Sequence, residues 1–181
     1  MYVERKITIF AEELNTKSFL IMKRIIMLAF MALTLGLASQ AQEYKTYENQ
    51  AFSIDYPADW EVTWDSESFM NLASPDESIK FDITFNEVGP TKEQLQECVD
   101  NWVYMKENNG NVVDQKLVKE DYALVRSIDT DEDDGTQTVV VWFIMISTEP
   151  QCFSGSIQSD YEHADEALNI LVKMLGTLSP K

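Results

Sequence analysis

Basic residues, histidine and cysteine are scarce in this chain. Its 181 residues include 14 lysines and arginines against 31 aspartates and glutamates, with one histidine and two cysteines. The excess negative charge excludes nucleic acid and anionic lipid surfaces as favoured partners, because both are polyanions. The acidic residues are expected mainly to form a solvated surface, which would also attract cations or basic proteins. No cysteine and histidine set has the spacing of a zinc site.

Recognisable catalytic motifs are also absent. The sequence contains no serine nucleophile elbow and no glycine-rich phosphate-binding loop. The single histidine, His163, lies among acidic residues at the start of an expected helix. We interpret it as an exposed helix position, in preference to a general base or a metal ligand. We therefore predict that the protein is not an enzyme. An unrecognised hydrolase with paired carboxylates in a cleft is the alternative.

Residues 22–41 have the order of a secretory signal. Positive charge at 23–24 precedes an apolar run over 25–37, and small residues follow in Ser39-Gln40-Ala41. The apolar run is shorter than the about 20 residues that a membrane-spanning helix needs. We predict a signal peptide cleaved after Ala41, export to the periplasm or the cell exterior, and no membrane span after cleavage. An uncleaved membrane anchor is the alternative.

Two further segments follow from this cleavage site. Residues 1–21 are mixed polar, and we interpret them as an upstream extension or a start-site artefact, with translation beginning at Met22. Residues 42–181 keep 9 of the basic and 28 of the acidic residues, which gives a net charge of −19. Their length is that of one domain with a sizeable core.

Both cysteines, Cys98 and Cys152, lie within this domain. Export would permit a disulfide between them. A domain of this length does not need one, and Cys98 falls on an apolar helical stripe. We prefer two unpaired buried thiols, and the pairing stays open.

The apolar periodicity predicts strands and helices in a definite order. Strands are expected at 52–56, 62–64, 69–73, 79–85, 112–118, 122–128, 139–146 and 151–158. Helices are expected after capping boxes at Thr91–Gln94 and Ser159–Glu162. Their predicted buried stripes are Leu95, Cys98, Val99, Trp102 and Met105, and Ala164, Ala167, Leu168, Leu171, Val172 and Leu175.

Short turns between successive strands require antiparallel pairing. The continuous apolar run 139–146 requires cover on both faces of its sheet. The sequence therefore predicts an α+β fold in which an antiparallel sheet is sandwiched by helices.

The acidic run at 129–134 resembles part of a calcium loop. Asp129, Asp131 and Asp133 have alternate spacing, but the EF-hand pattern then requires glycine at Asp134 and glutamate at Val140. We prefer a charged hairpin tip that discourages edge pairing. Weak calcium binding, in a calcium-responsive extracellular domain, is the alternative, and no other cofactor is predicted.

Trp64 is the candidate for a binding surface. Most of the aromatic residues recur at core periods, whereas Trp64 lies on a short expected strand just before the polar segment 65–68. We predict that it contacts a partner.

The segment Phe52-Ser53-Ile54-Asp55-Tyr56-Pro57-Ala58-Asp59-Trp60 resembles the opening motif of PsbP/DcrB-like domains, in which a strand ends in an aromatic residue and proline, followed by a short turn and tryptophan. The strand order, the helix after Gly89-Pro90 and the final helix before Thr177-Leu178-Ser179 are similar to the same family. The resemblance covers nearly all of 42–181 and implies an α/β/α sandwich. It implies no activity, because the family is diverse and often binds proteins.

We therefore predict an exported, non-enzymatic binding or accessory module with a protein partner in the cell envelope. The identity of that partner and the oligomeric state stay open.

Overall fold

Two antiparallel sheets organise the part of the chain that the computed structural model describes, residues 42–131 and 133–181. The predicted signal peptide and the segment before it lie outside these residues. The smaller sheet has the order β1-β2-β10, with β1 (Tyr44–Glu48), β2 (Phe52–Pro57) and β10 (Ser179–Pro180). The larger has the order β3-β4-β5-β9-β8-β7-β6.

The larger sheet follows the predicted strands closely. Its members are β3 (Glu61–Asp65), β4 (Phe69–Ala73), β5 (Ile79–Asn86), β6 (Val112–Val118), β7 (Tyr122–Thr130), β8 (Gln137–Thr148) and β9 (Gln151–Asp160). The helices are α2 (Leu95–Asn108) and α3 (Ala164–Thr177). Neither these nor the short 3-10 turns before them are long and apolar enough to cross a membrane.

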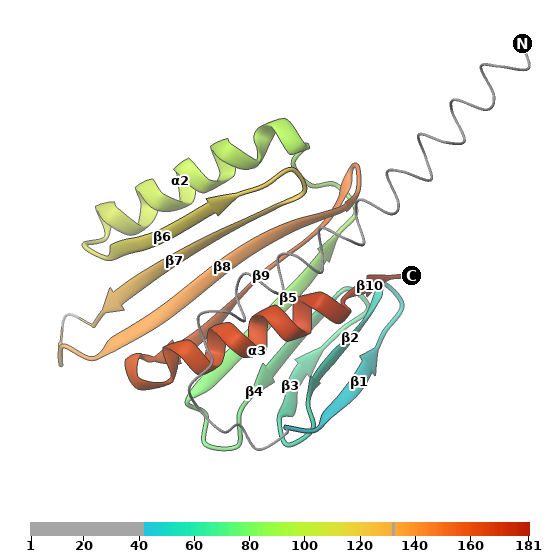
Figure 1. Cartoon of the computed structure of the whole chain (residues 1–181), viewed down its shortest axis with the longest axis horizontal. Coiled ribbons are helices and arrows are strands. Elements are labelled where there is room, and N and C mark those ends of the chain that lie inside the picture. Colours follow the sequence, from blue (N-terminus) through green and yellow to red (C-terminus); the bar gives the residue numbers. More distant parts are fainter. Residues whose placement is uncertain (1–41, 132) are drawn as a thin grey trace, which may run out of the picture. The chain divides into compact units, whose positions relative to one another are not determined.

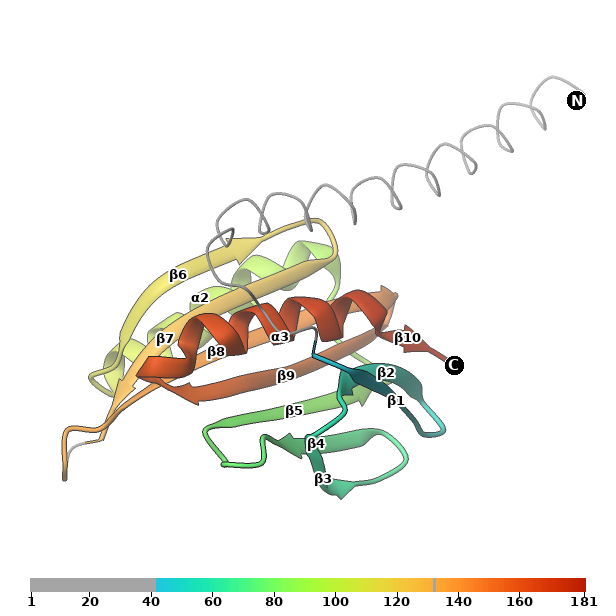
Figure 2. The same ribbon diagram turned by 60° about the horizontal axis from the view of Figure 1, so that its bottom comes forward.

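Strand β8 divides the core into two clusters. Val141 and Phe143 face a cluster built with α3, β2 and β5, whereas Ile144 and Ile146 face a cluster built with α2. Alternate residues of a strand point to opposite faces of a sheet, so the apolar run of β8 is covered on both sides, as predicted. Figures 1 and 2 show α3 and the small sheet on one face of the large sheet and α2 on the other.

The segment with the family resemblance closes one end of the α3-side core. Pro57 ends β2, and the Trp60 N–H donates to the Pro57 carbonyl over 3.1 Å. The Trp60 ring is 2% exposed and the Tyr56 side chain 6%. The proline-containing turn therefore folds the indole back into the core.

Helix α2 begins as predicted but buries a different stripe. The Thr91 N–H donates to the Gln94 side-chain oxygen over 2.9 Å, which confirms the first capping box. The buried residues of α2 are Leu95, Val99 and Val103. Met105, predicted to be buried, is 56% exposed. Helix α2 packs on β6 and β7, the last two strands at this end of the large sheet.

The prediction of a second capping box at Ser159–Glu162 was wrong. Asp160, not Ser159, caps the turn before α3, and its carboxylate accepts the His163 N–H over 3.1 Å. Ser159 is still paired in the ladder with Ile79 and Val139, so it cannot begin a helix. The α3 stripe also turns, because the helix packs on both β2 and β9. Its buried residues are Ala164, Ala167, Ile170, Leu171 and Met174, while Leu168, Val172 and Leu175 are half-buried.

Two strands at the N-terminal end depart from expectation. Strand β1 was not predicted, since Tyr44–Glu48 is largely polar, but backbone pairing with β2 orders it. Strand β3 matches the predicted strand 62–64, but all five of its residues are exposed in spite of the alternation of Val62 and Trp64 with polar residues. It is an edge strand, so only its β4 side has a partner.

Cover by helices on the α2 side is incomplete. Helix α2 packs on β6 and β7, the strands at one end of the large sheet. Strands β3, β4 and β5 form the opposite end of the sheet (Figure 1). Helix α2 thus covers β6 and β7 on one side, α3 packs on β9 on the other, and no described helix packs on the α2 side of β3, β4 and β5.

Candidate functional site

The bare part of the sheet presents a continuous row of side chains. Register places Trp64 opposite Asn71, Asn71 opposite Asp82, and Asp82 opposite Ser156. Ser156 in turn lies opposite Trp142 of β8. Residues directly opposite in a ladder share a face. The row therefore runs from Trp64 on the edge strand β3 to Trp142 of β8, on the face of the sheet that α2 partly covers. We call this surface of β3, β4, β5 and β9 the open face.

Aromatic residues bound the open face at both ends. At the edge, Trp64 packs on Phe69 with ring centroids 5.0 Å apart and is 65% exposed. At the other end, Trp142 stacks on Trp102 of α2 at 5.7 Å, with 19° between the rings. Between them, the next row is polar, because Phe69 lies opposite Thr84 and Thr84 opposite Ser154.

The open face is hollowed near the β4–β5 turn. A depression there measures about 530 Å³, and ligand clefts usually measure about 300 to 1,000 Å³. Its lining includes Glu61, Thr63, Asn71, Ala73, Lys80 and Asp82. Hydroxyl, amide and charged groups therefore line it, and one of them, Asn71, lies opposite Trp64 in the ladder.

Asp82 is a half-buried carboxylate of this surface. Burial raises its pKa, and hydrogen bonds from Ser156 oppose that rise. The Ser156 hydroxyl donates to one carboxylate oxygen over 2.6 Å and the Ser156 N–H to the other over 3.2 Å. Both carboxylate oxygens of Asp82 therefore accept hydrogen bonds that join β5 to β9. Asp82 thus has a structural role in the open face.

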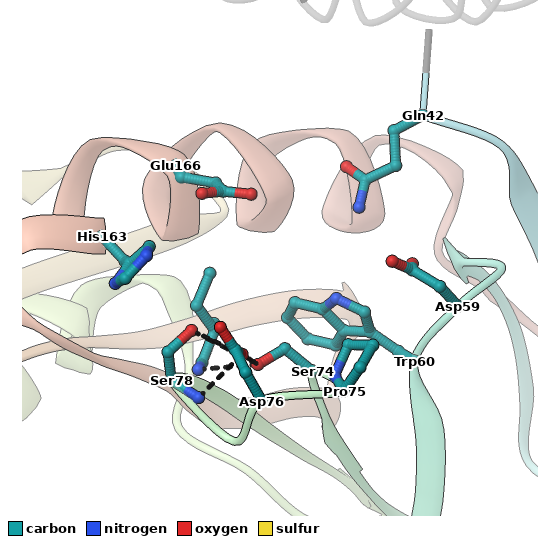
Figure 3. Close-up of a pocket in the computed structure, with 10 residues that line it drawn as sticks. Gln42, Asp59, Trp60, Ser74, Pro75, Asp76, Ser78, His163 and Glu166 are labelled. Atoms are coloured by element: carbon teal, nitrogen blue, oxygen red, sulfur yellow. Dashed lines mark hydrogen bonds between the residues drawn. The ribbon is translucent and has the colours of Figure 1, made fainter. Parts of the chain in front are cut away.

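A second pocket surrounds the single histidine. It measures about 290 Å³, and its lining includes Gln42, Asp59, Trp60, Asp76, His163 and Glu166 (Figure 3). The His163 Nδ1 lies 2.5 Å from an Asp160 carboxylate oxygen. This hydrogen bond raises the pKa of His163, burial opposes the rise, and the charges of Asp160, Glu166 and Asp76 add to it.

His163 therefore has a partner that the sequence did not reveal. The side chain of His163 is 37% exposed, which is close to the exposed position predicted for it at the start of the helix. Asp160 holds the His163 ring and also caps the turn before α3. The three-residue spacing between Asp160 and His163 is the sequence signal that indicates such a pair. No other described side chain is hydrogen-bonded to His163.

Asp76 shapes the floor of the same pocket. Its carboxylate accepts the Ser74 hydroxyl over 2.7 Å, the Ser78 hydroxyl over 2.8 Å and the Ser78 N–H over 3.1 Å (Figure 3). These bonds, led by that from Ser74, lower the pKa of Asp76 to about 2. The carboxylate therefore stays ionised in the β4–β5 turn.

The acidic run 129–134 is largely engaged by its own loop and by α2. Asp129 pairs with Lys106 and accepts the Ser127 hydroxyl over 2.8 Å. Asp131 accepts the N–H of Asp133 over 2.8 Å. Within residues 42–131 and 133–181, no three acidic, histidine or cysteine side chains are grouped to hold a metal ion. Calcium binding by these aspartates stays a prediction.

The cysteines are unpaired in this structure. Cys152 is buried in the α2-side core, and Cys98 is half-buried. The preferred prediction of unpaired thiols agrees with this, although Cys98 is less buried than expected.

Comparison with known proteins gives a likeness of fold. No known family profile and no curated sequence matches this chain. Among solved structures, the Ran-binding protein Mog1p of Saccharomyces cerevisiae is 13% identical with a TM-score of 0.52, over 77% of this chain and 96% of that one. PsbP (CyanoP) of Synechocystis sp. PCC 6803 is 10% identical with a TM-score of 0.52, over 81% and 99%.

The fold is PsbP-like. The expectation drawn from residues 52–60 is confirmed at the level of architecture. A crystal structure from Bacteroides thetaiotaomicron also matches, at 19% identity and a TM-score of 0.47, and this chain covers 45% of that chain.

Sequence reasoning found one boundary of the site in this PsbP-like domain and missed its floor. Trp64 was singled out and lies exposed at the edge. Asn71, Asp82, Thr84 and Ser156 were not singled out. The sequence shows these residues in period-two alternation in β4, β5 and β9. It does not show whether that face of the sheet is covered, because this depends on where α2 packs.

Proposed function

We propose that this domain is an exported, non-enzymatic module that binds a protein partner through the open face. The observation that carries the proposal is the exposure of Trp64, at 65%, on the edge of a polar sheet surface that no described helix covers. Tryptophan is enriched among the residues that contribute most to protein–protein affinity. A solvent-exposed indole at the rim of a bare sheet is therefore a natural anchor.

The chemistry of the open face resembles that of interfaces between separate proteins. Such interfaces combine aromatic anchors with hydrogen-bonding groups and a polar rim. Here Trp64 and Phe69 supply the apolar contact, and Asn71, Thr84 and Ser154 supply donors and acceptors. Full burial of the exposed indole would contribute about 2 to 4 kcal/mol to binding, the usual range for an interface hot spot.

Charge favours a basic partner. Residues 42–181 carry a net charge of −19, and Glu61 and Glu77 line the hollow beside a single lysine, Lys80. Long-range attraction between opposite charges raises association rates and weakens with salt. Partner capture should therefore decrease as ionic strength rises.

The structural neighbours support a binding role for the fold without transferring a partner. Mog1p is a Ran-binding protein by name, which shows that a domain of similar architecture binds another protein. The sites of such folds lie in their surfaces, so the partner of this chain must be found by experiment.

Export is proposed from the signal-like order of residues 22–41. The position of the fold supports it, because the folded unit begins at Gln42, the residue after the predicted cleavage site. Cell fractionation with mass measurement of the protein's N-terminus tests this part. An N-terminus at Gln42 in an envelope or medium fraction is expected, and an uncleaved protein in the cytoplasm would contradict it.

The binding proposal is tested by comparing two aromatic substitutions. Trp64→Ala removes the anchor of the open face. Tyr104→Ala removes an equally exposed aromatic of α2, at 68%, and serves as the matched control. Partners captured from the cell envelope are quantified for both variants and wild type. At least a tenfold loss for Trp64→Ala alone, about 1.4 kcal/mol, is expected. Equal losses for both would refute the open face as the site.

A further inference from the structure

The turn between β4 and β5 lies between the two hollows of the molecule. Ser74 and Pro75 line both of them. The next two residues diverge, because Asp76 lines the pocket that contains His163, whereas Glu77 lines the hollow of the open face. A shift of this turn would therefore change the shape of both hollows at once.

A continuous series of hydrogen bonds joins His163 to this turn. The His163 Nδ1 lies 2.5 Å from an Asp160 carboxylate oxygen, and the Asp160 N–H donates to the Ser78 carbonyl over 3.3 Å. Ser78 in turn donates its hydroxyl and its N–H to the Asp76 carboxylate over 2.8 and 3.1 Å (Figure 3). The histidine ring and the turn are therefore connected through one residue, Asp160.

The open-face side of the turn is fixed by the same groups. The Glu77 N–H donates to the Ser74 carbonyl over 2.9 Å, and the Ser74 hydroxyl donates to Asp76 over 2.7 Å. Glu77 has a φ of +59°, in the left-handed region, which a residue other than glycine keeps only where neighbouring contacts hold it. Its carboxylate lies 3.6 Å from the Lys80 ammonium, and both side chains line the open-face hollow.

Negative charge faces His163 from each element around it. Asp160 lies at the end of β9, Glu166 in α3 and Asp76 in the turn, and Asp59, after β2, lines the same pocket. None of these four carboxylates forms an ion pair with a described lysine or arginine. A histidine changes its charge between about pH 5 and pH 8. Loss of the ring proton therefore leaves the carboxylates of this pocket without a cation.

We propose that His163 regulates the open face by holding the turn between β4 and β5 in place while its ring is protonated. Once the ring is neutral, repulsion among Asp160, Asp76 and Glu166 displaces the turn, and the pair of Glu77 and Lys80 moves in the open-face hollow. Partner binding should then weaken as pH rises. This inference rests on the proposed function for its biological consequence, whereas the movement of the turn is a property of the chain alone.

The movement is tested by NMR titration of the isotope-labelled protein from about pH 5 to about pH 8. The amide signals of Glu77 and Lys80 are followed together with the His163 ring. We expect both amides to shift with the midpoint of the ring, and we expect this shift to disappear in His163→Gln. The amide of Tyr104, an exposed residue of α2, should not follow the ring.

Two variants separate a moving turn from the electric field of the ring. Asp76→Ala and Asp165→Ala each remove one negative charge near the start of α3, but only Asp76 is hydrogen-bonded within the turn. In Asp76→Ala, His163 should still titrate while Glu77 and Lys80 no longer follow it. In Asp165→Ala, they should follow it as in wild type. Amides that do not shift in wild type, or that follow the ring equally in both variants, would overturn the proposal.

The consequence for binding is measured by crosslinking to the isolated cell envelope from a photoreactive amino acid in place of Thr63, which lines the open-face hollow. The crosslink yield should fall about fivefold between about pH 5 and about pH 8, the lower end of the usual range of allosteric coupling. In His163→Gln it should not fall. An equal fall in both chains would overturn regulation by His163. The absence of a crosslink at any pH would contradict the proposed function, and the NMR titration would still decide whether the turn moves.

Discussion

The ion pair between Lys106 and Asp129 should be a measurable source of stability. Lys106 of α2 reaches across to Asp129 near the end of β7, and its ammonium also lies 4.9 Å from the Trp102 ring centroid. The two side chains are 18% and 26% exposed. Solvent-exposed pairs contribute about 0.2 to 1 kcal/mol, and breaking a fully buried pair costs about 3 to 5 kcal/mol.

This half-buried pair should fall between those limits. Lys106→Met keeps the aliphatic stem against Trp102 but removes the charge, and we expect a loss of about 1 to 2 kcal/mol in the free energy of unfolding. With a urea m-value of about 2 kcal/mol per molar, the midpoint should decrease by about 0.5 to 1 M.

A double-mutant cycle separates the pair from its surroundings. Lys106→Met and Asp129→Asn should couple by about 1 kcal/mol. The exposed pair Lys80–Glu77, at 3.6 Å with side chains 59% and 76% exposed, is the matched control and should couple by less than about 0.5 kcal/mol. Equal coupling in the two cycles would refute the reasoning from burial.

Three further predictions concern backbone contact and pH. Gly155→Ala should destabilise the domain by about 3 kcal/mol in urea unfolding, since a Cβ there would lie 2.1 Å from the Asp82 carbonyl oxygen. Burial raises the pKa of Asp82, so wild type should gain stability over Asp82→Asn as pH falls through the folded pKa, and a pH-independent difference would contradict this. The raised pKa of His163 should stabilise the fold below about pH 6.5 and cease to do so as pH rises through the folded pKa. Asp160→Asn should return the NMR-measured pKa of His163 toward its ordinary value.

Local sequence patterns predicted the architecture well where side chains alternate strongly. Phe81 and Ile83 of β5 and the apolar run of β8 identified their strands, and Thr91 with Gln94 identified the start of α2. These signals depend on neighbours a few residues apart, so they are readable without the fold. Strand β1 lacks such local signals, and backbone pairing with β2 orders it instead.

Features that depend on packing between distant elements were not predictable. Burial of Ile170 and Met174 follows from contact of α3 with both sheets. The open face follows from the position of α2 over β6 and β7. The pocket at Gln42 joins the first described residue to Asp59 and Glu166, which are far apart in sequence.

Site-specific crosslinking tests the central claim most directly. A photoreactive amino acid replaces Thr63, which lines the hollow beside Trp64, or Tyr104 on the outer surface of α2. The two chains are irradiated with the isolated cell envelope, and crosslinked proteins are identified by mass spectrometry. We predict one dominant product from position 63, absent from position 104 and reduced at least tenfold by Trp64→Ala. No product at position 63, or the same products from both positions, would contradict binding through the open face.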